Sequence, residues 1–244
     1  MRNELGLYST VTFEEDAAVT ASRHGDGFHM ALASGAAVTA HRLVLAYGVR
    51  DTLPDLPGLP ERWGHGVLHC PYCHGYELNR GPVGVLARNE MAMHQAMLLP
   101  DWGPTTLFTQ GAFVPTEEHR RTLAARGVAI EDVPIISLSG PAPALDAVQL
   151  EDGREVPVVG LFIAPQTALA DGLGAELGCK TTDGPTGPYI AVDGKQATSI
   201  PGVFAAGDLA AAMANATLAA AAGAMAGFAA HQSLIFAPNL SEDA

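Results

Sequence analysis

The stretch His69-Cys70-Pro71-Tyr72-Cys73-His74-Gly75-Tyr76-Glu77 is the most informative part of this 244-residue chain. Two cysteines separated by two residues can close a small disulfide, and this arrangement can lower the pKa of one thiol toward neutrality. Only the thiolate attacks a disulfide, and histidine is the side chain best suited to exchange a proton near pH 7. The stretch therefore predicts a dithiol redox centre.

A half zinc site is the alternative interpretation of the same stretch, because its ends and its thiols are all zinc-ligand types: His69, Cys70, Cys73 and His74. Four ligands within six residues cannot easily surround one tetrahedral ion, and the sequence has no second Cys-x-x-Cys. The pattern therefore favours redox chemistry over a zinc-binding module, and no metal ligand is assigned.

The composition indicates an α/β protein. The chain is 48% hydrophobic and 16% charged, so it can bury a sizeable core, and its aromatic share is only 6% with 27 glycines. The net charge is −13 and no cluster of basic residues is present, which argues against nucleic-acid binding. An anionic cofactor would therefore be held by backbone amides and helix ends.

Cysteine usage and hydropathy bear on the compartment. The third cysteine, Cys179, leaves an odd count, which argues against a secreted disulfide scaffold and for a reducing, cytoplasmic setting. Cys179 itself is expected to be a loop or packing residue. No signal peptide is evident at the N-terminus. The segment 209–230 has no charge, but it is mostly alanine and glycine, so we expect a buried helix of a soluble protein and no membrane span.

Periodicity predicts an alternation of strands and helices on both sides of the dithiol. Downstream, a βαβ pattern begins, and the expected elements are strand 83–86, helix 90–99, strand 105–108, helix 116–126, strands 128–130 and 135–138, a hairpin turn at 151–154 and strand 161–165. Upstream, a hairpin joins 17–23 to 28–32, strand 42–47 follows, and the proline-rich segment 53–60 indicates an inter-domain linker. Near the end, strand 202–208 leads into an alanine-rich helix over 215–234.

Three segments in this order carry a family resemblance. Ala46-Tyr47-Gly48 precedes a Leu-Pro-x-Leu-Pro-Gly linker, the dithiol follows, and Gly202-Val203-Phe204-Ala205-Ala206-Gly207-Asp208 lies far downstream. Together they resemble the thioredoxin reductase-like FAD/NAD(P)-dependent disulfide oxidoreductases. More narrowly, they resemble the Cys-Pro-Tyr-Cys-His branch found among small bacterial reductases and dithiol oxidases of natural-product pathways.

The resemblance implies a fold and a division into domains. The fold is α/β, a two-domain flavoprotein disulfide reductase-like architecture with three-layer Rossmann-like sheets. The expected divisions are an FAD-type domain formed by residues 1–59 and 166–244 and an NAD(P)-type domain, residues 60–165, that carries the Cys-x-x-Cys. A homodimer is also implied.

The resemblance also implies roles for individual residues. Cys73 would face the flavin, Cys70 would attack the substrate disulfide, and His74 would act as the acid–base group. Asp208 would bind the ribityl chain of FAD, and the start of the following helix would offer its N–H groups to the isoalloxazine. The cofactor-binding candidates are Gly48, Gly207, Asp208, Asn215, Thr217 and Leu218.

The chain departs from this family pattern in two places. No Gly-x-Gly-x-x-Gly precedes residue 40, so we expect the N-terminal FAD-binding βαβ unit, roughly 30 residues or more, to be missing. The turn Ala87-Arg88-Asn89-Glu90 carries side chains where glycines would let a pyrophosphate approach, and residues 108–111 include no cation. Tight NAD(P)H binding is therefore not expected.

The sequence thus predicts an FAD-dependent oxidoreductase that passes electrons between flavin, the Cys70/Cys73 pair and a thiol or disulfide. Its partner would be a small-molecule dithiol or disulfide, or a thioredoxin-like protein. An oxidase direction that uses dioxygen becomes attractive if the nicotinamide site is lost. The alternatives are a degenerate, flavin-free relative without catalysis and the zinc-binding module.

Overall fold

The computed structural model describes residues 2–237 and divides the chain into two compact units. Unit 1 combines the N-terminal residues up to Arg50 with the residues from Thr167 onward, and unit 2 is Asp51–Gln166. The division falls at 50/51 and 166/167, whereas the sequence placed it at 59/60 and 165/166. Strands β5 (Val49–Thr52) and β14 (Gln166–Leu169), which form a two-stranded sheet, carry the chain from one unit to the other.

Unit 2 is built on a five-stranded parallel sheet, with strand order β6-β13-β7-β8-β9. Its strands are β6 (Val67–Leu68), β7 (Val83–Leu86), β8 (Thr105–Phe108), β9 (Ala129–Glu131) and β13 (Gly160–Phe162). Every residue of β7 and β13 is buried, as expected for short apolar runs in a parallel sheet that is covered on both faces.

Alternate side chains of this sheet pack into two separate apolar clusters. Val83 and Val85 pack with Ala96 of helix α3, whereas Leu86 and Phe108 pack with residues of a second, antiparallel sheet. The helices are α3 (Ala92–Leu98) and α4 (Glu117–Ala125), and the antiparallel strands are β10 (Ile135–Ser139), β11 (Ala147–Leu150) and β12 (Glu155–Pro157). Unit 2 therefore has the three-layer, Rossmann-like arrangement that the sequence predicted.

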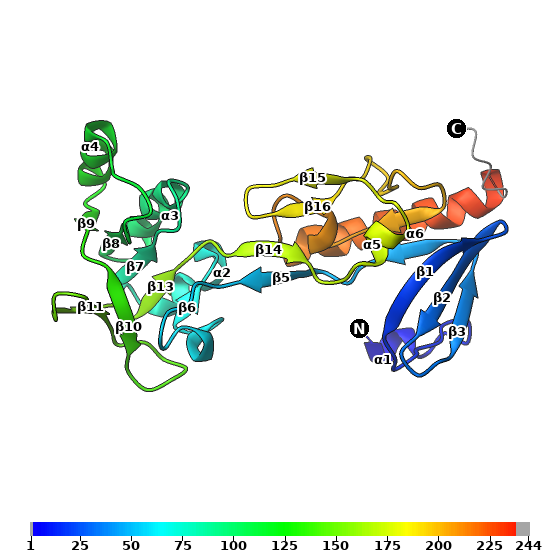
Figure 1. Cartoon of the computed structure of the whole chain (residues 1–244), viewed down its shortest axis with the longest axis horizontal. Helices are drawn as coiled ribbons and strands as arrows, with labels where there is room; N and C mark the ends of the chain where they lie inside the picture. Colours follow the sequence, from blue (N-terminus) through cyan, green and yellow to red (C-terminus); the bar gives the residue numbers. More distant parts are fainter. Residues whose placement is uncertain (1, 238–244) are drawn as a thin grey trace. The chain divides into compact units, whose positions relative to one another are not determined.

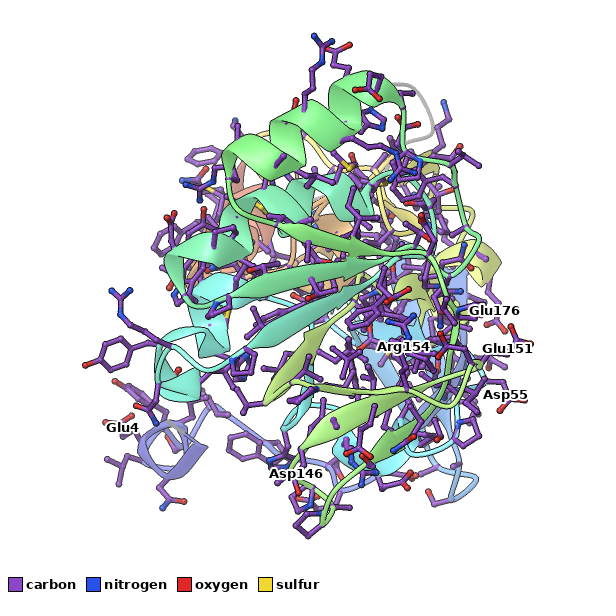
Figure 2. All side chains as sticks on the ribbon, turned by 90° about the vertical axis from the view of Figure 1, so that its left-hand side faces the viewer. Glu4, Asp55, Asp146, Glu151, Arg154 and Glu176 are labelled. Carbon is purple, nitrogen blue, oxygen red and sulfur yellow. The ribbon has the colours of Figure 1, made fainter. Side chains whose placement is uncertain are left out.

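An ion pair links two parts of unit 2. Arg154, labelled in Figure 2, follows the turn between β11 and β12, and its guanidinium lies 2.7 Å from a carboxylate oxygen of Glu131 at the end of β9. A second nitrogen of Arg154 lies 2.7 Å from Asp152. Hydrogen bonding to Arg154 lowers the pKa of Glu131, so this carboxylate stays ionised beside it.

Unit 1 is also layered (Figure 1). It contains an antiparallel sheet of β1 (Ala18–His24), β2 (Gly27–Leu32) and β3 (Ala37–Ala40), a parallel pair of β4 (Leu43–Leu45) and β17 (Val203–Ala205), and a hairpin of β15 (Thr181–Asp183) and β16 (Pro188–Ile190). One face of the parallel pair packs with Phe28 of β2, and the other, through Phe204 and Ala206, packs on helix α6 (Ala216–Phe236).

Short helices complete the two units. They are α1 (Arg2–Leu5) and α5 (Leu173–Glu176) in unit 1, α2 (Pro71–His74) in unit 2, and the 3-10 helices η1 (Pro60–Arg62), η2 (Tyr76–Leu78), η3 (Leu99–Asp101) and η4 (Asp208–Ala210). Cys179 is buried and lies 3.6 Å from the hydroxyl of Thr198, as expected for a packing residue.

The prediction of a buried C-terminal helix is wrong. Only 11% of the apolar window of α6 is buried, and Phe228 is 65% exposed. Ala226 and Ala229 are buried, because one helix face covers the narrow β4-β17 pair while the rest of the helix meets solvent. By length and composition alone, α6 is also long and apolar enough to cross a membrane.

Candidate functional site

The dithiol lies at the start of α2, between β6 and η2. Cys70 has an extended backbone (φ −109°, ψ 116°) and is the residue immediately before the helix, and Pro71 occupies the first helical position. Proline suits that position because its fixed φ is helical and its missing N–H has no partner there. The amide of Cys73 donates to the carbonyl of Cys70 at 3.2 Å, so the turn brings the two cysteines together.

The two thiols are free and differ in exposure: Cys73 is exposed and Cys70 is partly buried. A side-chain hydrogen bond with Cys70 raises the pKa of Cys73, and partial burial adds to this. A raised pKa lowers the thiolate fraction of Cys73 at neutral pH and so slows its nucleophilic attack. That Cys70 attacks the substrate first stays a prediction.

The two histidines beside the thiols have different environments. His74 is exposed in the last turn of α2. Crowding by neighbouring protein atoms lowers the pKa of His69, although this residue keeps contact with solvent, and the charge of Asp51 opposes the shift. The lowered pKa favours the neutral imidazole of His69, which is the form that can accept a proton.

Aromatic side chains surround the thiols. Tyr72 and Tyr76 are 73% and 86% exposed, and the ring of Tyr72 meets the indole of Trp102 edge-on, with ring centroids 5.3 Å apart. Gly75 lies beneath the same indole, where an added Cβ would come within 2.5 Å of the Trp102 ring. The close approach of Trp102 to α2 therefore requires glycine at position 75.

Gln95 is a residue of this site that the sequence analysis missed. Its side chain, in α3, is only 7% exposed, and its amide nitrogen donates to the carbonyl of His69 at 2.8 Å. Its side-chain oxygen is buried without a hydrogen-bond partner. A glutamine in a helical segment has no sequence signature of such a contact, so only the structure reveals it.

A cavity of about 340 Å³ lies in unit 1 at the carboxyl end of β17. Four of the six predicted cofactor residues line it, namely Gly207, Asp208, Asn215 and Leu218; Gly48 and Thr217 do not. Gly194, Gln196 and Met213 also line it, and sequence reasoning did not identify them. The cavity therefore lies between the Gly207-Asp208 segment and the beginning of α6.

The backbone N–H groups of Thr217 and Leu218, which were expected to face a flavin, are hydrogen-bonded within the protein. The side-chain oxygen of Asn215 accepts from the amides of Thr217 and Leu218, at 2.9 and 3.2 Å. This is the usual way in which asparagine caps a helix N-terminus. Asn215 therefore satisfies these two amides in the structure, and the role of this helix start in flavin binding stays a prediction.

The cavity residues fit one part of FAD. Gly207 has φ 84° with open space where a Cβ would lie, so a ligand can approach its backbone, and the carboxylate of Asp208 lies beside it. Gln196 also has a positive φ, 65°, and its side-chain oxygen is buried without a partner. Acceptors of this kind suit a polyhydroxyl chain such as ribityl. No Gly-rich phosphate cradle accompanies them before residue 40.

Three side chains near the expected nicotinamide-nucleotide site of unit 2 make contacts within the protein. The guanidinium of Arg88 donates to the carbonyl of Thr52 at 2.8 Å. The side chain of Gln110 bonds both backbone polar groups of Ile135. Glu90 adds a negative charge, paired with His119 at 3.2 Å. Weak NAD(P)H binding stays a prediction.

The arrangement of the described side chains does not support a metal site. Within residues 2–237, no group of three or more His, Cys, Asp or Glu side chains is arranged so that it could hold an ion. The four ligand-type residues at 69–74 therefore do not form a metal site in this conformation.

A three-layer α/β unit with an exposed Cys-x-x-Cys, together with a Gly-Asp segment entering a long helix, defines a thioredoxin reductase-like fold. The pattern of the pyridine nucleotide-disulphide oxidoreductase family matches residues 116–226. An oxidoreductase from Agrobacterium tumefaciens has a solved structure that is 42% identical, with a TM-score of 0.92 over 97% of this chain and 79% of that one. The solved structure of HlmI is 36% identical, with a TM-score of 0.85, and the match covers 96% of this chain and 74% of HlmI.

Curated relatives agree. Thioredoxin reductase sirT of Leptosphaeria maculans is 33% identical over 76% of this chain and 61% of its own length. Thioredoxin reductase tcpT of Claviceps purpurea is 32% identical over 83% and 65%. The chain therefore belongs to the pyridine nucleotide-disulphide oxidoreductases, among their thioredoxin reductase-like members. It spans somewhat under two thirds of the length of these two relatives.

Proposed function

We propose that this protein is an FAD-dependent dithiol/disulfide oxidoreductase whose reactive group is the Cys70/Cys73 pair. The observation that supports this most directly is the dithiol turn, in which the two thiols are free and a hydrogen bond between them raises the pKa of Cys73. The cavity beside Asp208 supports the flavin part of the proposal.

The chain's own residues account for the thiol chemistry. The Cys70 thiolate attacks a substrate disulfide, forms a mixed disulfide and releases the first substrate thiol. Cys73 then loses its proton, attacks the Cys70 sulfur and releases the second substrate thiol, which leaves a Cys70–Cys73 disulfide. His69 or His74 takes up or returns the proton at the thiols. Dithiol oxidation runs these steps in reverse: a substrate thiolate attacks the Cys70 sulfur of the Cys70–Cys73 disulfide and releases Cys73, and the second substrate thiol then displaces Cys70 as the substrate disulfide forms. When bound, FAD would accept the two electrons that turn the dithiol back into the disulfide.

Two side-chain contacts of unit 2 support one direction of electron flow. Because Arg88 and Gln110 are engaged with the protein backbone, we propose dithiol oxidation rather than NAD(P)H-driven reduction. A substrate dithiol and dioxygen would give a disulfide and hydrogen peroxide. The substrate is a small-molecule dithiol or a thioredoxin-like protein, in the cytoplasm, and the enzyme acts without nucleic acid or membrane.

Reconstitution tests the flavin proposal. The purified chain is refolded with FAD, freed of excess ligand and examined for bound flavin absorbance. A stoichiometric yellow complex that is lost in Asp208→Ala supports the proposal. A colourless protein contradicts it and leaves the flavin-free alternative. Oxygen consumption with dithiothreitol, compared with NADPH oxidation, then distinguishes the two directions.

A trapping experiment tests the thiol roles without a flavin. Each single-cysteine variant is mixed with an aromatic disulfide whose released thiol is coloured. Cys73→Ser should retain a mixed disulfide on Cys70, visible as added mass on the peptide that contains it. The wild type, quenched at short times, should carry the first adduct on Cys70, because the pKa of Cys73 is raised in the native pair. A first adduct on Cys73 would reverse the two roles.

A further inference from the structure

The two ends of the dithiol turn are held by one stretch of chain. Gln95, in α3, binds the carbonyl of His69, immediately before Cys70. Trp102, which follows η3, packs on Tyr72 and Gly75 at the Cys73 end. Residues 92–102 therefore contact the backbone on either side of the two sulfur atoms.

The burial of the Gln95 side chain does not by itself stabilise the folded state. It lies on the buried face of α3 together with Ala92 and Ala96, in the apolar cluster that covers the parallel sheet. Its side-chain oxygen has lost water without gaining a protein partner. An unsatisfied buried acceptor destabilises the folded state, whereas an apolar side chain of similar length at this position would not. Packing therefore does not explain an amide there.

We propose that Gln95 is a positioning residue for the redox pair. By holding the His69 carbonyl, it fixes the backbone that enters Cys70 and so keeps the Cys70 sulfur within bonding reach of Cys73. The inference rests on the proposed redox role of the pair but does not require flavin.

The physical consequence concerns disulfide closure. When one end of the turn is released, Cys70 samples more positions, and the effective concentration of one thiol near the other falls. Disulfide formation then loses more entropy, while the dithiol is little affected. The pair should therefore become easier to reduce when the Gln95 contact is removed.

The test is the thiol–disulfide equilibrium of the full chain with glutathione. In each exchange, one Cys70–Cys73 disulfide and two glutathione thiols give one dithiol and one glutathione disulfide. The free thiols are then alkylated and counted by mass. Gln95→Met keeps the length of the side chain but removes the amide. It should lower the equilibrium constant for disulfide formation by about tenfold, or about 30 mV in potential. Gln149→Met, at a β11 glutamine bonded to Glu155, is the matched control and should match the wild type.

The urea midpoint distinguishes the positioning role of Gln95 from a purely structural one. A structural role predicts a lower urea midpoint for Gln95→Met with an unchanged glutathione equilibrium, and that result overturns the proposal. Positioning predicts the shifted equilibrium with an unfolding midpoint equal to or above that of the wild type. If Gln95→Met does not fold, Gln95→Asn shortens the side chain by one methylene, and an unchanged equilibrium in it overturns the proposal equally. A colourless protein that shows the shift would contradict the flavin function and leave this inference intact.

Discussion

The acidity of the Cys73 thiol depends on its neighbour Cys70. The pKa of Cys73 is raised chiefly by its hydrogen bond with Cys70. The raised value is therefore a property of the pair and should disappear when the partner sulfur is removed.

Cys70→Ala should consequently lower the pKa of Cys73 toward its ordinary value of 9.0. The measurement is the rate of alkylation of Cys73 with iodoacetamide across pH, followed by peptide mass. The buried Cys179 is the internal control, since its pKa is raised by burial and should not respond. A rate profile for Cys73 that is the same with and without Cys70 would contradict the assignment.

His69 makes stability depend on pH. Its pKa lies below the ordinary value of 6.5, so the unfolded chain binds more protons between the two values. The contribution of His69 to stability is complete above pH 6.5 and is lost as the pH falls through the lowered pKa. Asp51→Asn removes the charge that opposes this shift, so an NMR titration should find a still lower His69 pKa in the variant. An unchanged or higher value would show that Asp51 does not act on the imidazole.

At the scale of the elements, α2 depends on a contact outside itself. Gly75 has helical angles (φ −64°, ψ −32°) that any residue can adopt, so backbone conformation does not explain the glycine. The nearby Trp102 ring does, because a Cβ would meet it at 2.5 Å.

Gly75→Ala should therefore displace the indole and change tryptophan fluorescence, with a destabilisation of about 1–3 kcal/mol from overpacking. The double variant Gly75→Ala/Trp102→Leu removes the indole but leaves the Pro71 carbonyl oxygen 2.6 Å from the added methyl group, so it should recover only part of that loss. Urea unfolding of the single and double variants measures both effects. An equal loss in both would mean that Trp102 is not the limiting contact.

Helix α6 offers a second test at this scale. Asn215→Ala leaves the amides of Thr217 and Leu218 without their acceptor, and the expected cost is about 1 kcal/mol in the free energy of unfolding. Asn215→Asp retains an acceptor and should stay close to the wild type. A neutral alanine variant would show that solvent satisfies these amides equally well.

The sequence predicted elements best where local signals determine them. The expected strands 83–86 and 105–108 are β7 and β8, because each is a short apolar run bounded by glycine, proline or polar residues. Helix α4 begins after Thr116, as predicted, with the threonine hydroxyl accepting from the His119 amide. Its capping residue and acidic first turn are local features.

Features that depend on distant packing were not predictable in this way. The burial of α6 was wrong because alanine-rich composition does not say how wide a sheet the helix covers. The contact of Gln95 with His69 joins residues 26 positions apart, and no spacing rule connects them. The occupation of the Thr217 and Leu218 amides by Asn215 was missed although its signal, an asparagine before a helix, was local.

At the scale of the whole molecule, unit 2 is formed by one continuous stretch of chain, whereas unit 1 is formed by two separate stretches. Both apolar clusters of unit 2 are formed entirely by residues between Leu56 and Ile163. Unit 1 instead pairs Leu43 with Val203, and Leu45 with Ala205, from opposite ends of the sequence.

A fragment of residues 51–166 should accordingly fold by itself. We expect a cooperative urea transition and the same alkylation pattern of Cys70 and Cys73 as in the full chain, because the residues that surround the thiols are all retained. A second fragment that ends before β13 lacks a strand of the parallel sheet and should not fold. A broad, non-cooperative transition in the 51–166 fragment would contradict this view.

The pairing of β4 with β17 also has a consequence during synthesis on the ribosome. At about 5–20 residues per second, β4 emerges roughly ten to thirty seconds before the strand that completes it. The β1–β3 sheet can form at once from neighbouring residues, but Leu43 and Leu45 must wait with their apolar side chains uncovered. Unit 2 can fold within that interval, so β17 pairs with a strand that was made before unit 2, and the nascent chain is most exposed to aggregation before that pairing.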